Sequence, residues 1–550
     1  MPSLKSIAER VRQSASDSAF EARVLHEAGI LGLMRPDKAA KIGITFIRWG
    51  ASPALGIAAA AIHHPDATAI IDERGSLTFE QLHRRSNALA HAFETMGIGY
   101  GDGVGIMCRN HRGFIEATLA TAKLGAGALY LNTMFAGPQL VEVMRREGPK
   151  ALVYDDEFSD LLESVEGGVE RVIGWTDDGA EGRTTIDGLI AENDDSDLKP
   201  PPDKPRFVIL TSGTTGTPKG AQRSSPDGLL AMAAIIDRIP YRSRETMVIA
   251  APLFHSWGFF HYVVRLPTAA TIVLRRRFDP DETLRAVRDH RAQVLAVVPV
   301  MVQRILQLPD ETLDRYSLPE LRITSISGSA LPGELATQWM DRFGDSVYNL
   351  YGSTEVSWAT VATPADLRAA PGTAGLPPRG TVVRLYDEDG HEVPRGEVGR
   401  IFVGNEMAFE GYTGGGGKEV IDGLFSSGDV GHLDAQGHLF IDGRDDEMIV
   451  SGGENVFPRE VEDLLADHEA VLEVAVIGVE DEEFGQRLKA FVVLEPGAEA
   501  GEADLRSHVK ANLAAYKTPR EVEFVEELPR NATGKVLKRD LHAREAQRSA

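Results

Sequence analysis

Short apolar runs alternate with amphipathic segments through the first half of the chain. Val104–Cys108, Ala151–Tyr154 and Phe207–Leu210 are each typical of a buried strand. A helix with small residues on one face is predicted at Gly113–Leu124. Buried strands that alternate with helices are typical of parallel sheets covered by helices. The pattern therefore predicts an α/β fold.

Nearer the C-terminus, apolar and polar residues alternate more strictly. Gly396–Val403 and Gly431–Phe440 are typical of antiparallel strands around tight turns, and they predict a small β-barrel. A compact α+β unit should follow, with helices and strands at residues 456–467, 471–479, 488–494 and 503–513.

At 550 residues the chain exceeds a single ordinary core, so we expect several domains. Residues 1–52 should form a helical N-terminal extension. Residues 53–445 should form a large domain of two parallel-sheet subdomains and the barrel. Residues 446–550 should form a smaller, mobile α+β domain.

The N-terminal extension differs from the rest of the chain in its charge. Residues 1–50 hold eight Lys and Arg against five Asp and Glu, a net charge of +3, whereas the whole chain carries −24. A basic amphipathic segment can lie on an anionic membrane surface. The charge excess is small, so we favour helices packed on the main body and leave a weak peripheral membrane contact open.

Composition excludes several classes of protein. A net charge of −24 argues against a nucleic-acid partner, because phosphates need Lys and Arg. The single cysteine, Cys108, allows no internal disulfide and no cysteine-based metal cluster. No apolar run approaches the ~18 residues of a membrane span. We therefore expect a cytoplasmic enzyme, at most peripheral at the inner membrane face, and leave its oligomeric state open.

A loop rich in glycine and hydroxyl side chains, Thr211–Gly220, directly follows the predicted strand Phe207–Leu210. Such a loop can bring backbone N–H groups and hydroxyls close to phosphate oxygens, and Lys219 adds a positive charge. The spacing does not match a Walker loop, because Pro218 stands where the second glycine would be. The alternative is a flexible linker, but a linker rarely follows a buried strand so closely.

Further candidate residues follow predicted strands, where parallel sheets bind ligands. Tyr351 could stack on a purine, Thr354 could bond a phosphate, and Glu355 could hold Mg²⁺. Asp429, which stands just before the predicted strand Gly431–Phe440, could accept hydrogen bonds from ribose hydroxyls, and Lys535 could reach into a cleft from a loop near the C-terminus. Taken singly, each has a structural alternative in turn chemistry or as a solvated surface charge.

A predicted loop at Ala251–Phe259 carries His255 between Phe254 and Trp257. Aromatic side chains around an imidazole suit the wall of an apolar pocket, although an isolated histidine is more often structural. We do not expect His255 to act as a general base, because carboxylic acids are already ionised near neutral pH.

In this order, the motifs resemble those of the acyl-adenylate-forming superfamily, which includes acyl-CoA synthetases, peptide-synthetase adenylation domains and beetle luciferases. The resemblance runs from about Pro53 to Arg539 and is closest to the bacterial fatty-acid–CoA ligases. It implies that the substrates are ATP, coenzyme A and a carboxylic acid, with Mg²⁺ as the metal. An acyl adenylate and pyrophosphate would form first, and the acyl group would then pass to coenzyme A.

The resemblance also assigns a role to each matched residue. ATP or AMP would be bound by Thr211, Ser212, Gly213, Thr214, Thr215, Gly216, Lys219, Gly328, Ser329, Ala330, Asn349, Tyr351, Gly352, Asp429 and Arg444. Thr354, Glu355 and Lys535 would be catalytic, and Glu355 would hold the metal. The acyl pocket would include His255, Trp257 and Gly328. Gly453 would line the coenzyme A tunnel, and Asp446 would be the hinge between the domains.

Three alternatives stay open at this stage. An acyl-AMP ligase that loads a carrier protein would resemble this chain, but would carry an inserted segment between the Tyr351 loop and Gly396, where none is obvious. An aromatic acid could replace the medium- or long-chain fatty acid. A non-catalytic binder is disfavoured, because Glu355, Asp429 and Lys535 are all retained.

Overall fold

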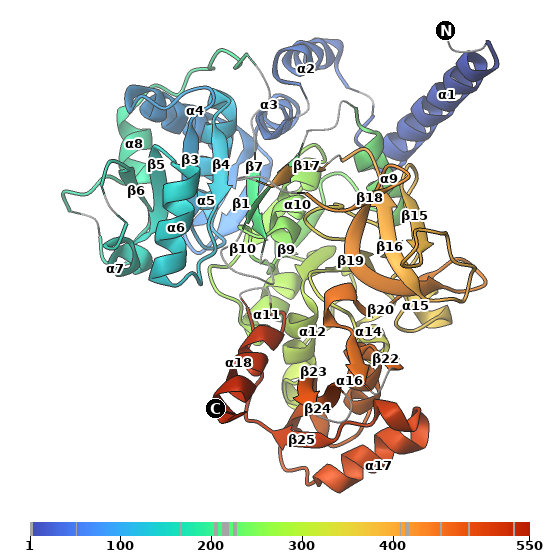
Figure 1. Ribbon diagram of the computed structural model, residues 1–550. Helices are drawn as coiled ribbons and strands as arrows, with labels where there is room; N and C mark the ends of the chain where they lie inside the picture. Colours follow the sequence, from blue (N-terminus) through green and yellow to red (C-terminus); the bar gives the residue numbers. More distant parts are fainter. Residues whose placement is uncertain are drawn as a thin grey trace.

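The computed structural model in Figure 1 describes most of the chain. The residues described are 4–32, 34–50, 52–165, 167–179, 181–202, 207–211, 219–223, 228–407, 409–412, 417–451, 454–481, 485–531 and 534–549.

One large sheet has seven strands in the order β17-β8-β7-β4-β3-β5-β6. The five strands from β7 to β6 are parallel, and β8 and β17 are added antiparallel at one edge. The strands are β3 (Gly103–Met107), β4 (Gly127–Tyr130), β5 (Ala151–Asp155), β6 (Glu170–Trp175), β7 (Phe207–Thr211), β8 (Lys219–Arg223) and β17 (Phe409–Tyr412).

The second large sheet has eight strands in the order β14-β13-β12-β11-β9-β10-β1-β2. Only the outermost pairs, β13 with β14 and β1 with β2, are antiparallel. The strands are β1 (Thr68–Asp72), β2 (Gly75–Thr78), β9 (Thr246–Ile249), β10 (Thr271–Leu274), β11 (Val294–Val297), β12 (Ile323–Ile326), β13 (Val347–Tyr351) and β14 (Thr360–Ala362). The predicted parallel α/β architecture is confirmed.

Helices cover both sheets and join them through one hydrophobic core. Every residue of α5 (Arg112–Leu124) is buried, so this helix lies wholly inside the large domain. The other helices of this part are α4 (Phe79–Thr95), α6 (Gly137–Glu147), α7 (Ser159–Leu162), α8 (Ile186–Glu192), α9 (Leu230–Arg238), α10 (Ser256–Arg265), α11 (Pro280–Asp289), α12 (Pro299–Leu306), α13 (Asp310–Leu313), α14 (Gly333–Phe343) and α15 (Pro364–Ala369).

A smaller antiparallel sheet follows at the place where the alternating pattern predicts a small β-barrel. Its order is β15-β16-β19-β18, with β20 paired to β19. The strands are β15 (Val382–Tyr386), β16 (Gly399–Gly404), β18 (Val420–Ile421), β19 (Leu424–Leu433) and β20 (Leu439–Arg444). Asp429 was expected just before the strand predicted at Gly431–Phe440, but it lies inside β19. This strand begins at Leu424, seven residues before the segment in which apolar and polar residues alternate.

The chain leaves this sheet at Arg444 and enters the C-terminal sheet at Ile449, through a single 3₁₀ turn at Asp445–Glu447. The C-terminal sheet has the order β22-β21-β24-β23, with β25 parallel to β24. Its elements are β21 (Ile449–Ser451), β22 (Glu454–Val456), β23 (Val471–Asp481), β24 (Gly485–Leu494), β25 (Glu521–Phe524), α16 (Pro458–Ala466), α17 (Glu502–Asn512) and α18 (Lys538–Ser549).

The N-terminal extension is helical, with α1 (Leu4–Glu27) and α2 (Pro36–Trp49) leading into α3 (Pro53–His63). Phe20, Val24 and Leu25 of α1 are buried in the main core. By contrast, α2 has no buried residue and lies on the outside of the molecule beside α3 (Figure 1). No helix within the described ranges is long and apolar enough to cross a membrane.

Candidate active site

One cavity of about 1560 Å³ lies between the large and small domains and continues into the large domain. Two loops that follow strands of the eight-stranded sheet form its floor. Ser327–Ala330 follows β12, and Gly352–Glu355 follows β13. Parallel sheets bind ligands at this carboxyl edge, because the loops that leave adjacent strands diverge there.

Most of the residues proposed from the sequence line this one cavity. They are His255, Trp257, Gly328, Ser329, Ala330, Asn349, Tyr351, Gly352, Thr354, Glu355, Asp429, Arg444 and Lys535.

The glycine-rich loop is described only at its two ends. Thr211 ends β7 and pairs with Lys219 at the start of β8, so the loop joins two adjacent antiparallel strands. Ser212, Gly213, Thr214, Thr215 and Gly216 lie outside the described residues. Gly453, expected in the coenzyme A tunnel, lies outside them as well.

Asp429, Tyr351 and Arg444 form a hydrogen-bonded group on the cavity wall. Asp429 and Arg444 face each other across β19 and β20, and Arg444 Nη1 lies 3.3 Å from Asp429 Oδ1. Tyr351 Oη donates to Asp429 Oδ2 at 2.6 Å. Burial raises the pKa of Asp429, and the positive charge of Arg444 opposes that rise. The group holds a carboxylate whose oxygens can accept hydrogen bonds from neighbouring hydroxyls.

Glu355 is held by a residue that no pattern in the sequence singled out. Tyr412 Oη donates to Glu355 Oε1 at 2.7 Å. Tyr412 lies on β17 and pairs with Ala221 of β8, next to the strand that carries Lys219. The pKa of Tyr412 is raised, first by burial and then by its bond to Glu355. No sequence signal could link the two residues, because their contact depends on how β17 joins the seven-stranded sheet.

The residues around Glu355 fit a magnesium ion. Mg²⁺ binds hard oxygen ligands and usually takes only one or two carboxylates, together with substrate phosphates. Glu355 and the hydroxyl of Thr354 supply such oxygens on the same cavity wall.

Lys535 reaches the cavity from the small domain through a tight turn. Lys535 N donates to Asn531 Oδ1 at 2.9 Å, and Asn531 N donates to Lys535 O at 2.9 Å. Gly534 before it has φ of +79°, and a Cβ there would come within 2.1 Å of Val300 Cγ1 on α12. Only glycine fits both the left-handed backbone and this approach. Lys535 and Asp429 line the same cavity, so in this structure the small domain is turned toward the large-domain site, and the positive charge of Lys535 opposes the rise in the pKa of Asp429.

The opposite end of the cavity is apolar. Trp257 was expected in a loop, but α10 begins at Ser256, so Trp257 lies in its first turn and His255 caps the helix by accepting from Trp257 N. Trp257 is 4% exposed, its Nε1 donates to Val297 O at 3.0 Å, and its ring stacks on Phe260. Burial lowers the pKa of His255 to about 4, so this imidazole is neutral near pH 7.

Beyond Trp257 the cavity extends between α9, α10 and α3 toward the N-terminal extension. Leu229, Met232, Ile235 and Val263 line one side. The lining on the side of the extension was not expected from the sequence, and it comprises Gly29, Ile30, Leu31, Met34, Ile42, Phe46, Ser52, Pro53, Leu55, Gly56, Ala59, Ala60, His63 and His64.

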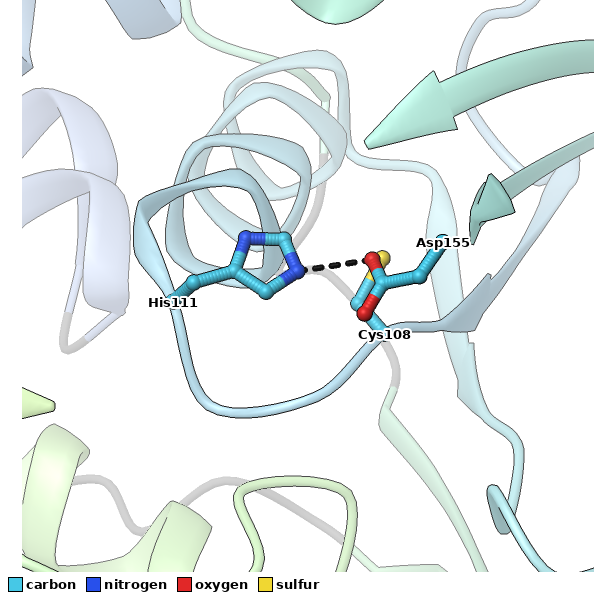
Figure 2. Close-up of side chains that lie close together, drawn as sticks. All are labelled: Cys108, His111 and Asp155. Carbon is cyan, nitrogen blue, oxygen red and sulfur yellow. Dashed lines mark hydrogen bonds and ion pairs between the residues drawn. The ribbon is translucent and has the colours of Figure 1, made fainter. Parts of the chain in front are cut away.

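A second cluster, Cys108, His111 and Asp155, lies inside the seven-stranded subdomain (Figure 2). His111 Nδ1 accepts from Gly113 N at 3.0 Å, so the proton is on Nε2, which donates to Asp155 Oδ1 at 2.7 Å. Burial raises the pKa of the Cys108 thiol well above its ordinary value. With both ring nitrogens used and the thiol protonated, the cluster caps the start of α5 and provides neither a metal site nor a nucleophile.

Comparison with known proteins agrees with this geometry. The family described as AMP-binding enzyme matches residues 57–413, and the AMP-binding enzyme C-terminal domain matches residues 460–535. The fatty acid–[acyl-carrier-protein] ligase ScoC of Streptomyces coeruleorubidus is 31% identical over 88% of this chain and 94% of its own. The indoleacetate–CoA ligase of Aromatoleum aromaticum is 32% identical over 87% of this chain and 95% of its own.

Solved structures show the same fold. The ATP-bound structure of MatB from Rhodopseudomonas palustris superposes with a TM-score of 0.79 at 29% identity, and the match covers 89% of this chain and 98% of that chain. The chain therefore belongs to the AMP-binding enzyme family, and it is an adenylate-forming acid ligase.

Proposed function

We propose that this protein activates a medium- or long-chain fatty acid with ATP and transfers the acyl group to coenzyme A. The observation that carries the proposal is the division of one cavity into two ends. Its polar end holds Glu355, Asp429, Arg444 and Lys535, and its other end is lined mainly by aliphatic and aromatic side chains.

The apolar end supports an unbranched aliphatic acid. Among its described lining residues between 29 and 269 there is no Lys, Arg, Asp or Glu. His64 there adds no charge near pH 7, because burial lowers its pKa to about 4. If the acid carried a second charged group, that group would find no oppositely charged partner in the channel, and burying an unpaired charge is costly. Methylene groups lose no hydrogen bonds on entering such a channel.

In the first half-reaction the substrate carboxylate attacks the α-phosphorus of ATP, a new P–O bond forms, and the bond to pyrophosphate breaks. The carboxylate is already ionised, so no general base is needed, in agreement with a neutral His255. Lys535 and the loop Thr211–Gly220 would neutralise charge that develops on the phosphates. Asp429 would accept the ribose hydroxyls, and Tyr351 would stack beside the adenine. Mg²⁺ at Glu355 would supply further charge neutralisation when bound.

In the second half-reaction the thiol of coenzyme A displaces AMP from the acyl adenylate. Lys535 occupies the side of the cavity that faces the small domain, so a thiol needs that domain to turn away. We place the hinge at Asp446, inside the 3₁₀ turn between β20 and β21, and the domain boundary at residues 445 and 446. Gly453 would then lie along the path of the pantetheine arm.

Particular observations bear on two alternatives, one to coenzyme A and one to the fatty acid. A carrier protein could replace coenzyme A, as in the name of ScoC. Residues 352–396 hold only β14, α15 and β15 between irregular segments, with no inserted unit, so coenzyme A is favoured. An aromatic acid, as in the name of the indoleacetate ligase, could stack on Trp257 and Phe260. The channel continues past that wall toward α3, which favours a longer aliphatic chain.

The rate of pyrophosphate release with acids of increasing length should distinguish between these candidate substrates. With decanoate, laurate and palmitate, kcat/KM for pyrophosphate release should rise roughly fourfold per methylene until the channel is filled. Indoleacetate and ferulate should be poor substrates, and mass spectrometry should detect the acyl-CoA. Met232→Trp should shift the optimum to shorter acids. A clear preference for an aromatic acid, or turnover only with an acyl carrier protein, would refute the proposal.

Lys535→Ala should lose roughly two to three orders of magnitude in pyrophosphate release, because it removes a positive charge from the phosphates. Conversion of a supplied acyl adenylate to acyl-CoA should stay near the parental rate. Lys510→Ala, an exposed lysine on α17, is the matched control and should leave both steps intact. Equal losses in both half-reactions would show that Lys535 does not serve adenylation specifically.

Gly534→Ala should also impair adenylation more than thioester formation, because the new Cβ collides with Val300 and the backbone has a positive φ. The double variant Gly534→Ala, Val300→Ala removes the Cγ atom and should restore part of the lost rate. Stopped-flow measurement of adenylate formation compares the variants. If the single variant adenylates normally, the observed Gly534–Val300 approach is not required for catalysis.

Asp446→Pro should hold the domains in the observed orientation, because a proline is tolerated in the first turn of a helix and then limits rotation about φ. Pyrophosphate release in the first turnover should survive, whereas acyl-CoA formation should collapse. Asp446→Ala is the control that keeps backbone freedom. If the proline variant keeps both half-reactions at parental rates, the hinge lies elsewhere.

A further inference from the structure

The outer face of α2 is apolar although it is exposed. Ile44 is 54% exposed and Ile47 is 84% exposed, and Ala40 and Gly43 lie on the same face. None of the residues in α2 is buried. Two large aliphatic side chains side by side on a surface helix are costly in water, so this face is suited to contact with another apolar phase.

The basic charge of the N-terminal extension is concentrated on this helix. Residues 1–34 contain four basic and four acidic residues, whereas residues 35–50 contain Arg35, Lys38, Lys41 and Arg48 against the single Asp37. Residues 35–50 therefore carry +3 in a chain whose net charge is −24. Lys41 and Arg48 are both exposed and border the face of Ile44 and Ile47 on the helical wheel.

The inner face of α2 contacts the apolar end of the active-site cavity. Ile42 and Phe46 line that cavity, and Lys38 Nζ donates to His63 O of α3 at 2.8 Å. The same short helix thus forms part of the channel wall through Ile42 and Phe46 and exposes Ile44 and Ile47 on its other side. Figure 1 shows this helix on the outside of the molecule.

Charge decides between the occupants that could cover this face. A second copy of the chain in a two-fold contact would bring one basic segment against another, which like-charge repulsion opposes. Anionic lipid headgroups complement Lys41 and Arg48, and the boundary between headgroups and acyl chains accepts Ile44 and Ile47.

We propose that α2 docks this protein on an anionic phospholipid surface. Ile44 and Ile47 insert at the boundary between headgroups and acyl chains, and Lys41 and Arg48 bind the headgroups. Because the rest of the chain is strongly acidic and is repelled by such a surface, binding depends on this helix. The inference that the channel then opens toward the lipid, where apolar acids partition, rests on the proposed function, whereas the docking itself does not.

Sedimentation of the full-length protein with vesicles tests the docking without any substrate. Vesicles of phosphatidylcholine with phosphatidylglycerol should bind the protein, those of phosphatidylcholine alone should bind it far less, and high salt should release it. The double variant Lys41→Gln, Arg48→Gln should weaken binding about fivefold for each charge removed. Ile44→Ser, Ile47→Ser should abolish it.

Val382→Ser, Val398→Ser is the matched control, because these valines are 46% and 47% exposed. They lie at the start of β15 and just before β16, which are apart from α2 in Figure 1. The control should bind vesicles like the parent. All variants should release pyrophosphate with a short, soluble acid at the parental rate, which separates docking from catalysis. The proposal would be overturned if the parent did not sediment with the vesicles, or if the Ile44→Ser, Ile47→Ser variant sedimented equally well. It would also be overturned if light scattering showed that the parent is a dimer and that this variant is a monomer.

Discussion

The approach of Gly534 to Val300 is the contact on which the arrangement of this site depends. The cavity wall that carries Glu355 and Asp429 belongs to the large domain, whereas Lys535 belongs to the small one. A lysine can reach across a domain boundary only if its loop comes close to the opposite surface. The missing Cβ and the left-handed backbone of Gly534 allow that approach, and Gln303 Nε2 adds a second contact by donating to Leu472 O. Both contacts fall on α12, so this helix is one of the surfaces that the small domain contacts, as β20 is through α16.

On the large-domain side, strand pairing orients the side chains. Asp429 and Arg444 face each other because β19 and β20 pair in that register, and Tyr412 reaches Glu355 because β17 pairs with β8. A carboxylate held by a donor before substrate arrives needs little reorganisation when it binds. The backbone at Gly352 packs closely against the backbone at Ser357, because a Cβ at Gly352 would lie 2.1 Å from Ser357 O.

Much of the fold and of the polar end of the site could be predicted from the sequence. Tyr351 ends β13, and the loops at Ser327 and Gly352 directly follow β12 and β13, so local pattern and topology are sufficient to bring them to one edge of a sheet. Tyr412 could not be found, because its contact with Glu355 joins two sheets. The helix that holds Trp257 was missed for a local reason. The Ala-Pro-Leu segment at residues 251–253 suggests a loop, whereas the His255 side chain caps a helix that begins at the next residue.

The apolar end was the least predictable part, because its walls come from segments far apart in the sequence. The second half of α1 is fixed by buried Phe20 and Val24 and by ion pairs from Arg23 to Asp237 and from Arg379 to Asp17. α2 lies along α3 and is joined to it by the hydrogen bond from Lys38 Nζ to His63 O, but none of its residues is buried. The channel therefore has one wall fixed by buried side chains and one wall formed by a helix that buries none of its residues. Since a shift of such a helix uncovers little buried apolar surface, α2 is the part of the wall that can move with least cost when an acid enters.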